Sequence, residues 1–277
     1  MAIEKSRSPE QFIAFEEAGW DAAIAAYENA FGPVSRQIVE LLLDAANVRA
    51  GMRVLDVCTG PGMLAAAAIE RGAQAIGLDF AQEVVALAQR RVPAGEFHRG
   101  DAQHLPFPDD SFDAAVCAYG VIHVPVSDMA LREMVRLVRP GGRVAISVWD
   151  STTANNGFGL VYAAVRAHGS FDVPLPHGPD YFQFSTEGKM QAALTEIGLS
   201  EIDTAFVDQR WHVNCSAQLL DAMQNGTVRV RALLGAQSEA ASVKIRQFLT
   251  DTLATMSNPG GGFDVPLPAL IGRGVKP

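Results

Sequence analysis

Long apolar runs are missing from this sequence, and cysteine and positive charge are scarce in it. No run of about 18 apolar residues occurs, so we expect no membrane-spanning helix. The opening residues, Met-Ala-Ile-Glu-Lys-Ser-Arg, lack the apolar core of a signal peptide, and we expect none.

Cysteine and histidine are too scattered for a disulfide framework or a metal site. The three cysteines, Cys58, Cys117 and Cys215, lie far apart and form no Cys-x-x-Cys pair. An odd and scattered set is typical of a reduced, cytoplasmic protein, and we expect that location. The six histidines show no metal-ligand spacing, so we expect no metal.

Negative charge exceeds positive charge. The 31 Asp and Glu residues outnumber the 22 Lys and Arg residues, and the formal net charge is −9. Binding to phosphates needs a basic face, so nucleic acid is not an expected partner. With 277 residues, 48% of them hydrophobic, the chain is long enough to bury a full core.

The chain is organised around residues 54–68. A β-branched run ends at Val57, a turn with Gly60 and Gly62 follows, and an alanine-rich helix comes next. Glycine has no Cβ, so the backbone amides of this turn can approach a ligand closely. The start of the helix adds unpaired N–H donors and a partial positive charge. This arrangement suits a ligand that carries a carboxylate or a phosphate.

Asp56 narrows the choice of ligand. A carboxylate at the end of the strand repels a pyrophosphate and attracts an ammonium group. A ligand with both a carboxylate and an ammonium fits better, and the amino-acid tail of S-adenosylmethionine is such a group. The spacing Gly60-x-Gly62-x-x-Ala65 also matches the dinucleotide fingerprint, so an NAD-dependent oxidoreductase remains an alternative.

The pattern Asp-x-x-x-Gly-Pro-Gly at residues 56–62 resembles the first motif of the class I S-adenosylmethionine-dependent methyltransferases. The fuller family motif is acid-x-Gly-x-Gly-x-Gly, and Cys58 stands where its first glycine is usual. The resemblance implies that this turn binds the amino-acid tail of the cofactor. The residues implied are Asp56, Thr59, Gly60, Pro61 and Gly62.

A second acid, Asp79, ends the second expected strand, and Phe80 follows it. An acid at this place can accept hydrogen bonds from a ribose diol in either cofactor. A helix N-cap is the alternative role of Asp79. We expect both residues beside the nucleoside, because the preceding turn independently predicts one there.

A third acid follows the third expected strand, residues 96–99. The run Gly100-Asp101-Ala102-x-x-Leu-Pro-Phe, followed by an acidic turn, resembles small-molecule methyltransferases of the ubiquinone-biosynthesis type. The resemblance implies that Asp101 binds the exocyclic amine of adenine and that the N–H of Ala102 meets the ring. A carboxylate acceptor and an amide donor suit those roles. An ordinary turn Asp is the alternative.

Two motifs of related enzymes are absent after the fourth expected strand, residues 113–118. The Asn/Asp-Pro-Pro-aromatic motif of nucleic-acid amino-methyltransferases does not occur, nor does the acid with which metal-dependent catechol-type enzymes hold a divalent ion. The resemblance therefore implies a metal-free enzyme that acts on a small molecule. Ala118 and Tyr119, at the end of this strand, are expected to contact the cofactor.

Methyl transfer from a sulfonium is a one-step displacement, in which a general base helps when the acceptor must lose a proton. We select His123 as the catalytic candidate, because it follows strand four at the carboxyl edge of the sheet, where ligands bind in open α/β folds. A structural histidine that bonds to backbone is the alternative. Further candidate bases are Tyr119, His177, Tyr181 and His212.

The order of expected strands and helices predicts an α/β fold. The resemblance implies a Rossmann-like, seven-stranded, mostly parallel sheet with helices on both faces, an antiparallel last strand and a helical lid. We divide the chain into an N-terminal helical cap (1–47), a cofactor-binding core (48–150) and a C-terminal part (151–277) that completes the sheet. The lid is expected as an insertion at about 216–257.

Three aromatic residues are candidate substrate contacts. Trp20 and Tyr27 lie on one face of two short helices expected before Pro33, and either pack as part of the cap or touch the ligand from a lid. Tyr181 stands in an aromatic-rich loop. Beyond this loop, alternation over residues 201–213 predicts one long strand.

Three functions remain open at this point. The leading hypothesis is transfer of a methyl group from S-adenosylmethionine to an O, N or C nucleophile of a small-molecule acceptor. The second is an NAD-dependent oxidoreductase, which Asp56 and Asp101 disfavour. The third is a nucleoside-binding protein of the same fold without methyl transfer, since the cofactor motifs would survive such a change.

Overall fold

The computed structural model describes residues 9–153, 156–256 and 261–277. The chain divides into two compact units. The first, here called the sheet unit, comprises Ser35–Asp150, Gly178–Val207 and Ala269–Pro277. The second, the helical unit, comprises Met1–Val34, Ser151–His177 and Asp208–Pro268.

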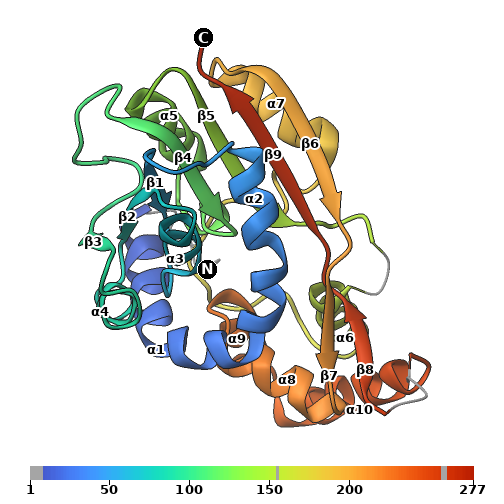
Figure 1. Ribbon diagram of the computed structural model, residues 1–277. Helices are drawn as coiled ribbons and strands as arrows, with labels where there is room; N and C mark the ends of the chain where they lie inside the picture. Colours follow the sequence, from blue (N-terminus) through green and yellow to red (C-terminus); the bar gives the residue numbers. More distant parts are fainter. Residues whose placement is uncertain (1–8, 154–155, 257–260) are drawn as a thin grey trace. The chain divides into compact units, whose positions relative to one another are not determined.

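A seven-stranded sheet forms the centre of the sheet unit (Figure 1). β9 runs antiparallel to both of its neighbours, β5 and β6, whereas the other neighbouring strands of this sheet are parallel to each other. The predicted Rossmann-like sheet with an antiparallel last strand is therefore confirmed. In spatial order the strands are β3 (Glu96–Arg99), β2 (Gln74–Asp79), β1 (Arg53–Val57), β4 (Phe112–Ala118), β5 (Val138–Trp149), β9 (Ala269–Val275) and β6 (Ser200–Val207).

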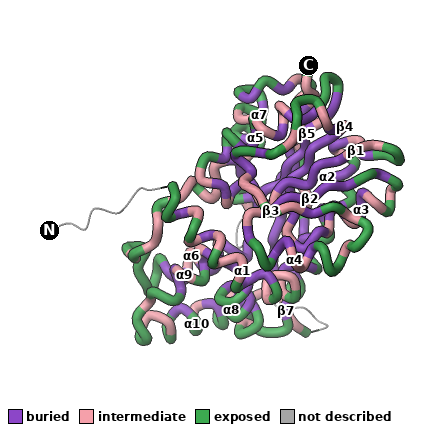
Figure 2. Tube along the Cα trace, turned by 90° about the vertical axis from the view of Figure 1, so that its left-hand side faces the viewer, coloured by how far each residue is buried: buried purple, intermediate pink, exposed green. Residues whose placement is uncertain are grey.

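Helices flank the sheet, and the central strands are buried between them, as the purple tube of β1, β2, β4 and β5 shows in Figure 2. In β1, Val54, Leu55 and Val57 are almost fully buried, which explains the continuous apolar run that marked this strand in the sequence. The helical segments of this unit are η1 (Arg36–Ile38), α2 (Val39–Ala45), α3 (Met63–Glu70), α4 (Gln82–Arg91), η2 (Val121–His123), α5 (Ser127–Leu137) and α7 (Glu187–Glu196).

Residues 35–47, which the predicted N-terminal cap includes, lie in the sheet unit. Helix α2 packs against α3 and the strands β4, β5 and β9. Its side chains Val39, Leu42 and Leu43 are buried there. The break between the two units comes before this helix because its apolar face covers the sheet.

The helical unit contains most of the long N-terminal helix and the segment predicted as a lid. Breaks near Gly226 and Gly235 divide the predicted lid segment into three helices; residue 257 lies outside the described residues. A two-stranded antiparallel sheet completes the unit. The elements are α1 (Pro9–Ser35), α6 (Gly157–His168), α8 (Ser216–Asn225), α9 (Arg229–Gly235), α10 (Glu239–Ala254), β7 (Arg210–Val213) and β8 (Phe263–Pro266).

Helix α1 differs from the two short helices expected before Pro33. It runs without interruption to Ser35, with Pro33 inside its last turn. Inside a helix, proline removes one backbone donor, and its ring crowds the carbonyl of the residue four positions earlier. Phe31 and Val34 on either side of the proline are 1% exposed, and their burial stabilises the helical conformation across it.

The long strand expected over residues 201–213 was also wrong. Two strands, β6 and β7, occupy this stretch and belong to different sheets. Between them Gln209 is fully buried, and its Nε2 donates to the carbonyl oxygen of Val34 at 2.7 Å. In each of the two strands, one face is more buried than the other, so the side chains alternate in both. The alternation therefore continues from β6 into β7, and the sequence does not show that the chain passes from one sheet to another.

Candidate functional site

The turn between β1 and α3 depends on backbone conformations that favour glycine. Gly60 and Gly62 have φ values of 55° and 83°, and Gly62 is the N-cap of α3. A Cβ at Gly62 would lie 3.2 Å from the ring of Phe97, so the space there is tight and adds to the preference for glycine that the backbone conformation sets. The turn is closed by hydrogen bonds from the Thr59 N–H to the oxygen of Leu78 and from the Gly62 N–H to the oxygen of Thr59, both 3.0 Å.

Cys58, which departs from the family motif, adopts a φ of 55°. Its side chain has room because residue 120 is glycine: a Cβ at Gly120 would lie 2.2 Å from the Cβ of Cys58. The thiol of Cys58 also shares a hydrogen bond with that of Cys117. This hydrogen bond and burial raise the pKa of the Cys58 thiol, so it stays protonated at neutral pH.

Asp56 lies beneath the turn and is 1% exposed. Its Oδ2 accepts hydrogen bonds from the Thr59 hydroxyl at 2.7 Å and from the backbone N–H of Ala65 at 3.2 Å. Burial raises the pKa of Asp56 to about 7, and the charge of Asp79 adds to the effect. The carboxyl group therefore uses a donor from the first turn of α3 that a pyrophosphate would otherwise take.

Asp79 connects the turn after β1 with the end of β2. Its Oδ2 accepts from the Gly60 N–H at 3.1 Å, and its Oδ1 accepts from the Ala81 N–H at 3.2 Å, just before α4. The backbone oxygen of Asp79 accepts from the Gly100 N–H at 2.9 Å, at the end of β3. The oxygen of Phe80, the next residue, accepts from the Arg99 Nε at 3.0 Å. One continuous set of hydrogen bonds thus joins three strand ends.

Asp101 is the most exposed of the three predicted acids, with 44% of its side chain accessible. It accepts hydrogen bonds from the backbone and the side chain of Gln103, and its Oδ2 lies 3.2 Å from the Nδ1 of His104. Ala102, the predicted backbone donor, is 5% exposed. The strand order β3-β2-β1 brings the predicted acids of all three strands to one edge of the sheet.

Helix α5 supports the loop that follows Asp101, a contribution that the sequence analysis missed. Arg136 donates to the backbone oxygens of Leu105 and Phe107, both at 3.0 Å. Glu133 accepts from the Leu105 N–H at 2.8 Å and forms an ion pair with Arg136, which lowers the pKa of Glu133. The sequence does show an acidic and a basic residue three positions apart on one helix, but such pairs are common on exposed helices and do not indicate that they support a loop.

The end of β4 presents Ala118 and Tyr119. Tyr119 has a φ of 59°, and its N–H donates to the Ser147 oxygen at 2.9 Å. Its ring stacks on Trp149, with centroids 3.8 Å apart and planes at 14°. Trp149, which was not among the predicted site residues, therefore sets the orientation of Tyr119, while Ala118 is half-buried beside it.

His123, the candidate base, lies in η2 and is partly exposed. The ring of Tyr181 meets it edge-on, with centroids 5.8 Å apart. Gln183 donates from Nε2 to the Ser127 hydroxyl at 2.9 Å, so the loop that carries Tyr181 is attached to the start of α5. The structure therefore places the predicted base and one predicted substrate contact side by side.

The two other candidate histidines belong to the helical unit. The Nδ1 of His212, on β7, lies 2.8 Å from a carboxylate oxygen of Asp264 on the paired strand β8. His177 is the last residue of its segment in that unit.

Trp20 and Tyr27, the remaining predicted substrate contacts, are integrated into the helical unit. The Trp20 Nε1 donates to Glu16 at 3.1 Å, and its ring meets Tyr27 edge-on at 5.4 Å. Glu16 is 0% exposed and pairs with the Nε of Arg229 at 2.8 Å. Tyr27 also stacks on Phe31. These contacts favour the interpretation of the aromatic face as packing within the cap, and a role in ligand binding stays a prediction.

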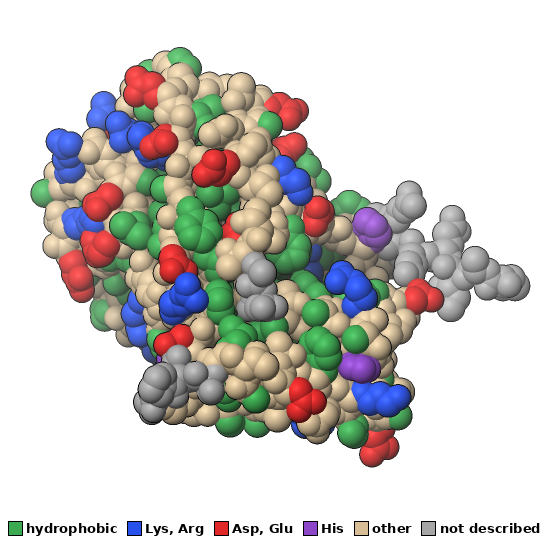
Figure 3. Space-filling view, turned by 90° about the vertical axis from the view of Figure 1, so that its right-hand side faces the viewer, with side chains coloured by type: hydrophobic (Ala, Val, Ile, Leu, Met, Phe, Trp, Pro, Cys, Tyr) green, Lys and Arg blue, Asp and Glu red, His purple; other side chains and the backbone are tan. Residues whose placement is uncertain are grey.

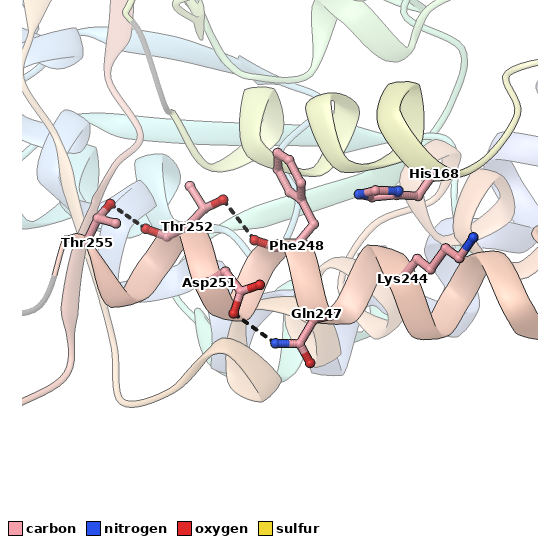
Figure 4. A pocket seen from close by; sticks show the side chains of 7 residues that line it. All are labelled: His168, Lys244, Gln247, Phe248, Asp251, Thr252 and Thr255. Atoms are coloured by element: carbon pink, nitrogen blue, oxygen red, sulfur yellow. Dashed lines mark hydrogen bonds between the residues drawn. The ribbon is translucent and has the colours of Figure 1, made fainter.

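An open depression lies on the helical unit, between the end of α6 and α10 (Figure 4). Its polar groups bond largely to one another: Gln247 donates to Asp251 at 2.8 Å, and the Thr252 hydroxyl donates to the oxygen of Phe248 at 2.8 Å. None of the predicted site residues lines it.

Within the described residues, no group of three or more His, Cys, Asp or Glu side chains is arranged to hold a metal ion. Over the same part of the chain, no helix has the length and apolar character needed to cross a bilayer.

Comparison with known proteins identifies one domain. Residues 54–142 match the family model described as a methyltransferase domain. An uncharacterized protein of Mycobacterium tuberculosis is 32% identical over 59% of this chain and 59% of its own length. The demethylmenaquinone methyltransferase of Beutenbergia cavernae is 41% identical over 39% of this chain and 45% of its own. The chain thus spans about half the length of the curated relatives it matches.

Among solved structures, the phosphoethanolamine N-methyltransferase 2 of Haemonchus contortus, in complex with S-adenosyl-L-methionine, has a TM-score of 0.56. Its sequence identity is 20%, and the match covers 93% of this chain and 57% of that one. At this identity the likeness concerns the fold, and it agrees with the observed sheet.

Proposed function

We propose that this chain, whose residues 54–142 form a methyltransferase domain, transfers a methyl group from S-adenosylmethionine to a small-molecule acceptor. The sequence resemblance to class I enzymes of the ubiquinone-biosynthesis type is confirmed for this domain by the family model and by the demethylmenaquinone methyltransferase relatives. Methyl transfer is a direct displacement: the acceptor nucleophile forms a bond to the methyl carbon, the bond from carbon to the sulfonium sulfur breaks, and S-adenosylhomocysteine leaves.

The observation that carries this proposal is the hydrogen-bonded edge of β3, β2 and β1. Asp79 accepts from Gly60 through its side chain and from Gly100 through its backbone, so three ligand-facing loops are held together. We assign the amino-acid tail of the cofactor to the turn 56–62, the ribose to Asp79 and Phe80, and the adenine to Asp101 and Ala102. Ala118 and Tyr119 would border the nucleoside at the end of β4.

Asp56 has a supporting role in this assignment. Because its Oδ2 holds Thr59 and Ala65, it fixes the shape of the turn, and its negative charge favours an ammonium group nearby. The same contacts disfavour the NAD-dependent alternative, since a pyrophosphate at the start of α3 would compete with the carboxyl group for the Ala65 N–H. A nucleoside-binding protein without methyl transfer remains the alternative that only turnover can separate.

The residues of this chain would contribute mainly by positioning the reactants, since the sulfonium methyl carbon is already electrophilic. His123 would accept a proton from the acceptor, and Tyr181 beside it would contact the acceptor. We extend the proposal to a lid role for residues 216–257 and to a cytoplasmic location, which the free cysteines Cys58, Cys117 and Cys215 support.

A small-molecule acceptor is supported by the net charge of −9 and by the demethylmenaquinone methyltransferases among the relatives. On the face shown in Figure 3, acidic and basic side chains lie interspersed rather than in a field of one sign. A protein that binds nucleic acid needs a continuous basic surface.

The test has two stages. Calorimetry should detect binding of S-adenosylhomocysteine and not of NAD, and incubation of the enzyme and S-adenosylmethionine with a panel of small acceptors should yield S-adenosylhomocysteine. His123→Gln should lower kcat by about 10²-fold or more if His123 is the base. His98→Gln, which removes an exposed histidine paired with Glu96, is the matched control and should retain full activity. Binding without turnover on any acceptor would favour the nucleoside-binding alternative.

A further inference from the structure

We propose that Gln103 is a positioning residue for adenine recognition, which orients the Asp101 carboxylate and ties it to the segment preceding α5. The inference rests on the proposed function, because it concerns the base of the same cofactor. Gln103 itself is 7% exposed and would not need to touch the ligand.

Both the nitrogen and the oxygen of the Gln103 side-chain amide form hydrogen bonds. Its Nε2 lies 3.1 Å from the Oδ1 and 3.2 Å from the Oδ2 of Asp101. Its Oε1 accepts from the backbone N–H of Val126 at 3.2 Å. The backbone N–H of Gln103 adds a 2.9 Å bond to the Oδ1 of Asp101. A buried amide with both ends satisfied has one orientation, and it passes that orientation to the carboxylate.

These contacts use the two oxygens of Asp101 unequally. Oδ1 receives the two shorter bonds, both from Gln103, whereas Oδ2 has two contacts of 3.2 Å, from Gln103 and His104. An ionised carboxylate offers about four acceptor positions and no donor. Of the contacts to Oδ2, the one to His104 comes from a side chain that is 72% accessible, so a ligand N–H can take its place on Oδ2.

This orientation makes the site selective for a base with an exocyclic amine. The amine of adenine donates to a fixed carboxylate oxygen, whereas the carbonyl oxygen that hypoxanthine carries at the same position repels it. Without the side-chain amide of Gln103, the Asp101 carboxylate would keep the bond from the backbone N–H of Gln103 but lose both bonds from Nε2. It could then turn more freely about its side-chain bonds, and the difference in affinity for the two bases would shrink.

The same amide joins two parts of the site. Val126 lies between η2, which carries His123, and α5. Gln103 therefore fixes the base-recognition loop against the segment that carries the candidate base. The bond to Val126 and the bond to Asp101 can be separated experimentally, because they use opposite ends of one side chain.

The experiment compares S-adenosylhomocysteine with S-inosylhomocysteine, in which oxygen replaces the adenine amine, by calorimetry on the full chain. The wild-type protein should prefer the adenine compound. Gln103→Met keeps the length of the side chain but loses both amide contacts, and it should reduce this preference about tenfold, the effect of one hydrogen bond to a charged group. Gln89→Met is the matched control: the Gln89 amide donates to the oxygen of Phe97 at 3.2 Å and has no contact with Asp101, so the preference should not change.

Gln103→Glu provides the second variant. It keeps an oxygen that accepts from Val126 and loses the donors to Asp101, so hydrogen exchange at the Val126 amide should stay slow while the preference falls as in Gln103→Met. If Gln103→Met does not fold, this variant decides alone. A wild-type preference in folded Gln103→Glu would overturn the inference, and so would an equal loss of preference in Gln89→Met. Failure of the wild-type protein to bind S-adenosylhomocysteine would instead overturn the proposed function itself.

Discussion

The two units of this protein use the same kinds of side chain in different ways. In the sheet unit, acids at strand ends accept hydrogen bonds from backbone amides of the loops, as Asp79 does from Gly60. In the helical unit, a fully buried acid, Glu16, pairs with Arg229 and accepts from the indole of Trp20. An acid bonded to loop amides arranges a surface for a ligand, whereas an acid enclosed between helices holds those helices together. Substitutions in the two units should therefore affect different measurements.

The largest effect on stability is expected from Glu16→Ala. It leaves the Arg229 guanidinium, only 17% exposed, without its buried partner. Breaking a buried ion pair by removing one member costs about 3 kcal/mol, so the free energy of unfolding should fall by about that amount. Denaturant titration measures the loss.

A double variant sharpens this prediction. In Glu16→Leu/Arg229→Met both charges are gone, and replacement of a buried pair by apolar groups is often close to neutral. The double variant should recover most of the lost stability. A double variant as unstable as Glu16→Ala would show that lost packing around Glu16, and not the lost ion pair with Arg229, causes the destabilisation.

Asp79→Asn tests the sheet unit, where we expect the effect of a substitution to appear in ligand affinity. The two carboxylate oxygens of Asp79 accept hydrogen bonds from the N–H groups of Gly60 and Ala81, whereas the Asn side chain has only one oxygen acceptor. The variant also loses the negative charge that attracts the ribose hydroxyls. Affinity for S-adenosylhomocysteine should fall by about 1–3 kcal/mol in calorimetry. Unchanged affinity in a folded variant would contradict the ribose assignment.

Asp56 should make cofactor binding depend on pH near neutrality. Its pKa in the free protein is about 7, and a bound ammonium favours the ionised form. Affinity for S-adenosylhomocysteine should therefore rise as pH increases from about 6 to 8, by at most tenfold per unit below the pKa, and binding should release a proton. Asp56→Asn should remove this dependence. An affinity in the wild-type protein that is independent of pH over this range would contradict the role of Asp56.

The contribution of Asp56 to the stability of the free protein should change with pH in the opposite direction from the affinity for the cofactor. The unfolded carboxyl has a pKa of 3.8, whereas folding raises it to about 7. Between these values the folded state binds more protons than the unfolded state, so the contribution of Asp56 to stability declines as pH rises through this range. The difference in unfolding free energy between the wild-type protein and Asp56→Asn, measured at several pH values, isolates this contribution.

The smallest effect is expected from Trp20→Phe, which removes only the indole bond to Glu16. Unfolding free energy should fall by about 1 kcal/mol, and KM for the acceptor should not change, because the ring packs within the helical unit. A severalfold change in KM with little loss of stability would support the lid hypothesis for Trp20 instead.

The gathering of the three acids at one edge of the sheet could be predicted from the sequence because each acid lies at or near the end of a strand, whereas their binding of the cofactor stays a prediction. Asp56 lies in β1, Asp79 is the last residue of β2 and Asp101 comes two residues after β3, and parallel strands bring their carboxyl ends to one edge. The turn glycines were equally readable, since positive φ values and close packing at Gly62 leave few other residues possible.

The parts that were missed depend on contacts between distant residues. Arg136 supports the loop at Leu105 and Phe107 from another helix, and Trp149 stacks on Tyr119 from the neighbouring strand. The division of residues 201–213 between two sheets depends on the pairing partners β9 and β8, which lie far along the chain. Local periodicity carries no information on such partners.

Because Cys58 and Gly120 are closely packed, whether a substitution at one of these positions is tolerated depends on which of the two is replaced first. Replacement of Cys58 by glycine empties the space and is compatible with the chain as it stands. A methyl group at position 120 would collide with the Cys58 side chain, whereas after residue 58 has lost its Cβ the remaining close neighbour is the Cys117 Sγ at 3.1 Å, which needs to shift by only a few tenths of an ångström. In a combinatorial library, side chains at position 120 should therefore be recovered together with glycine at position 58 and rarely without it.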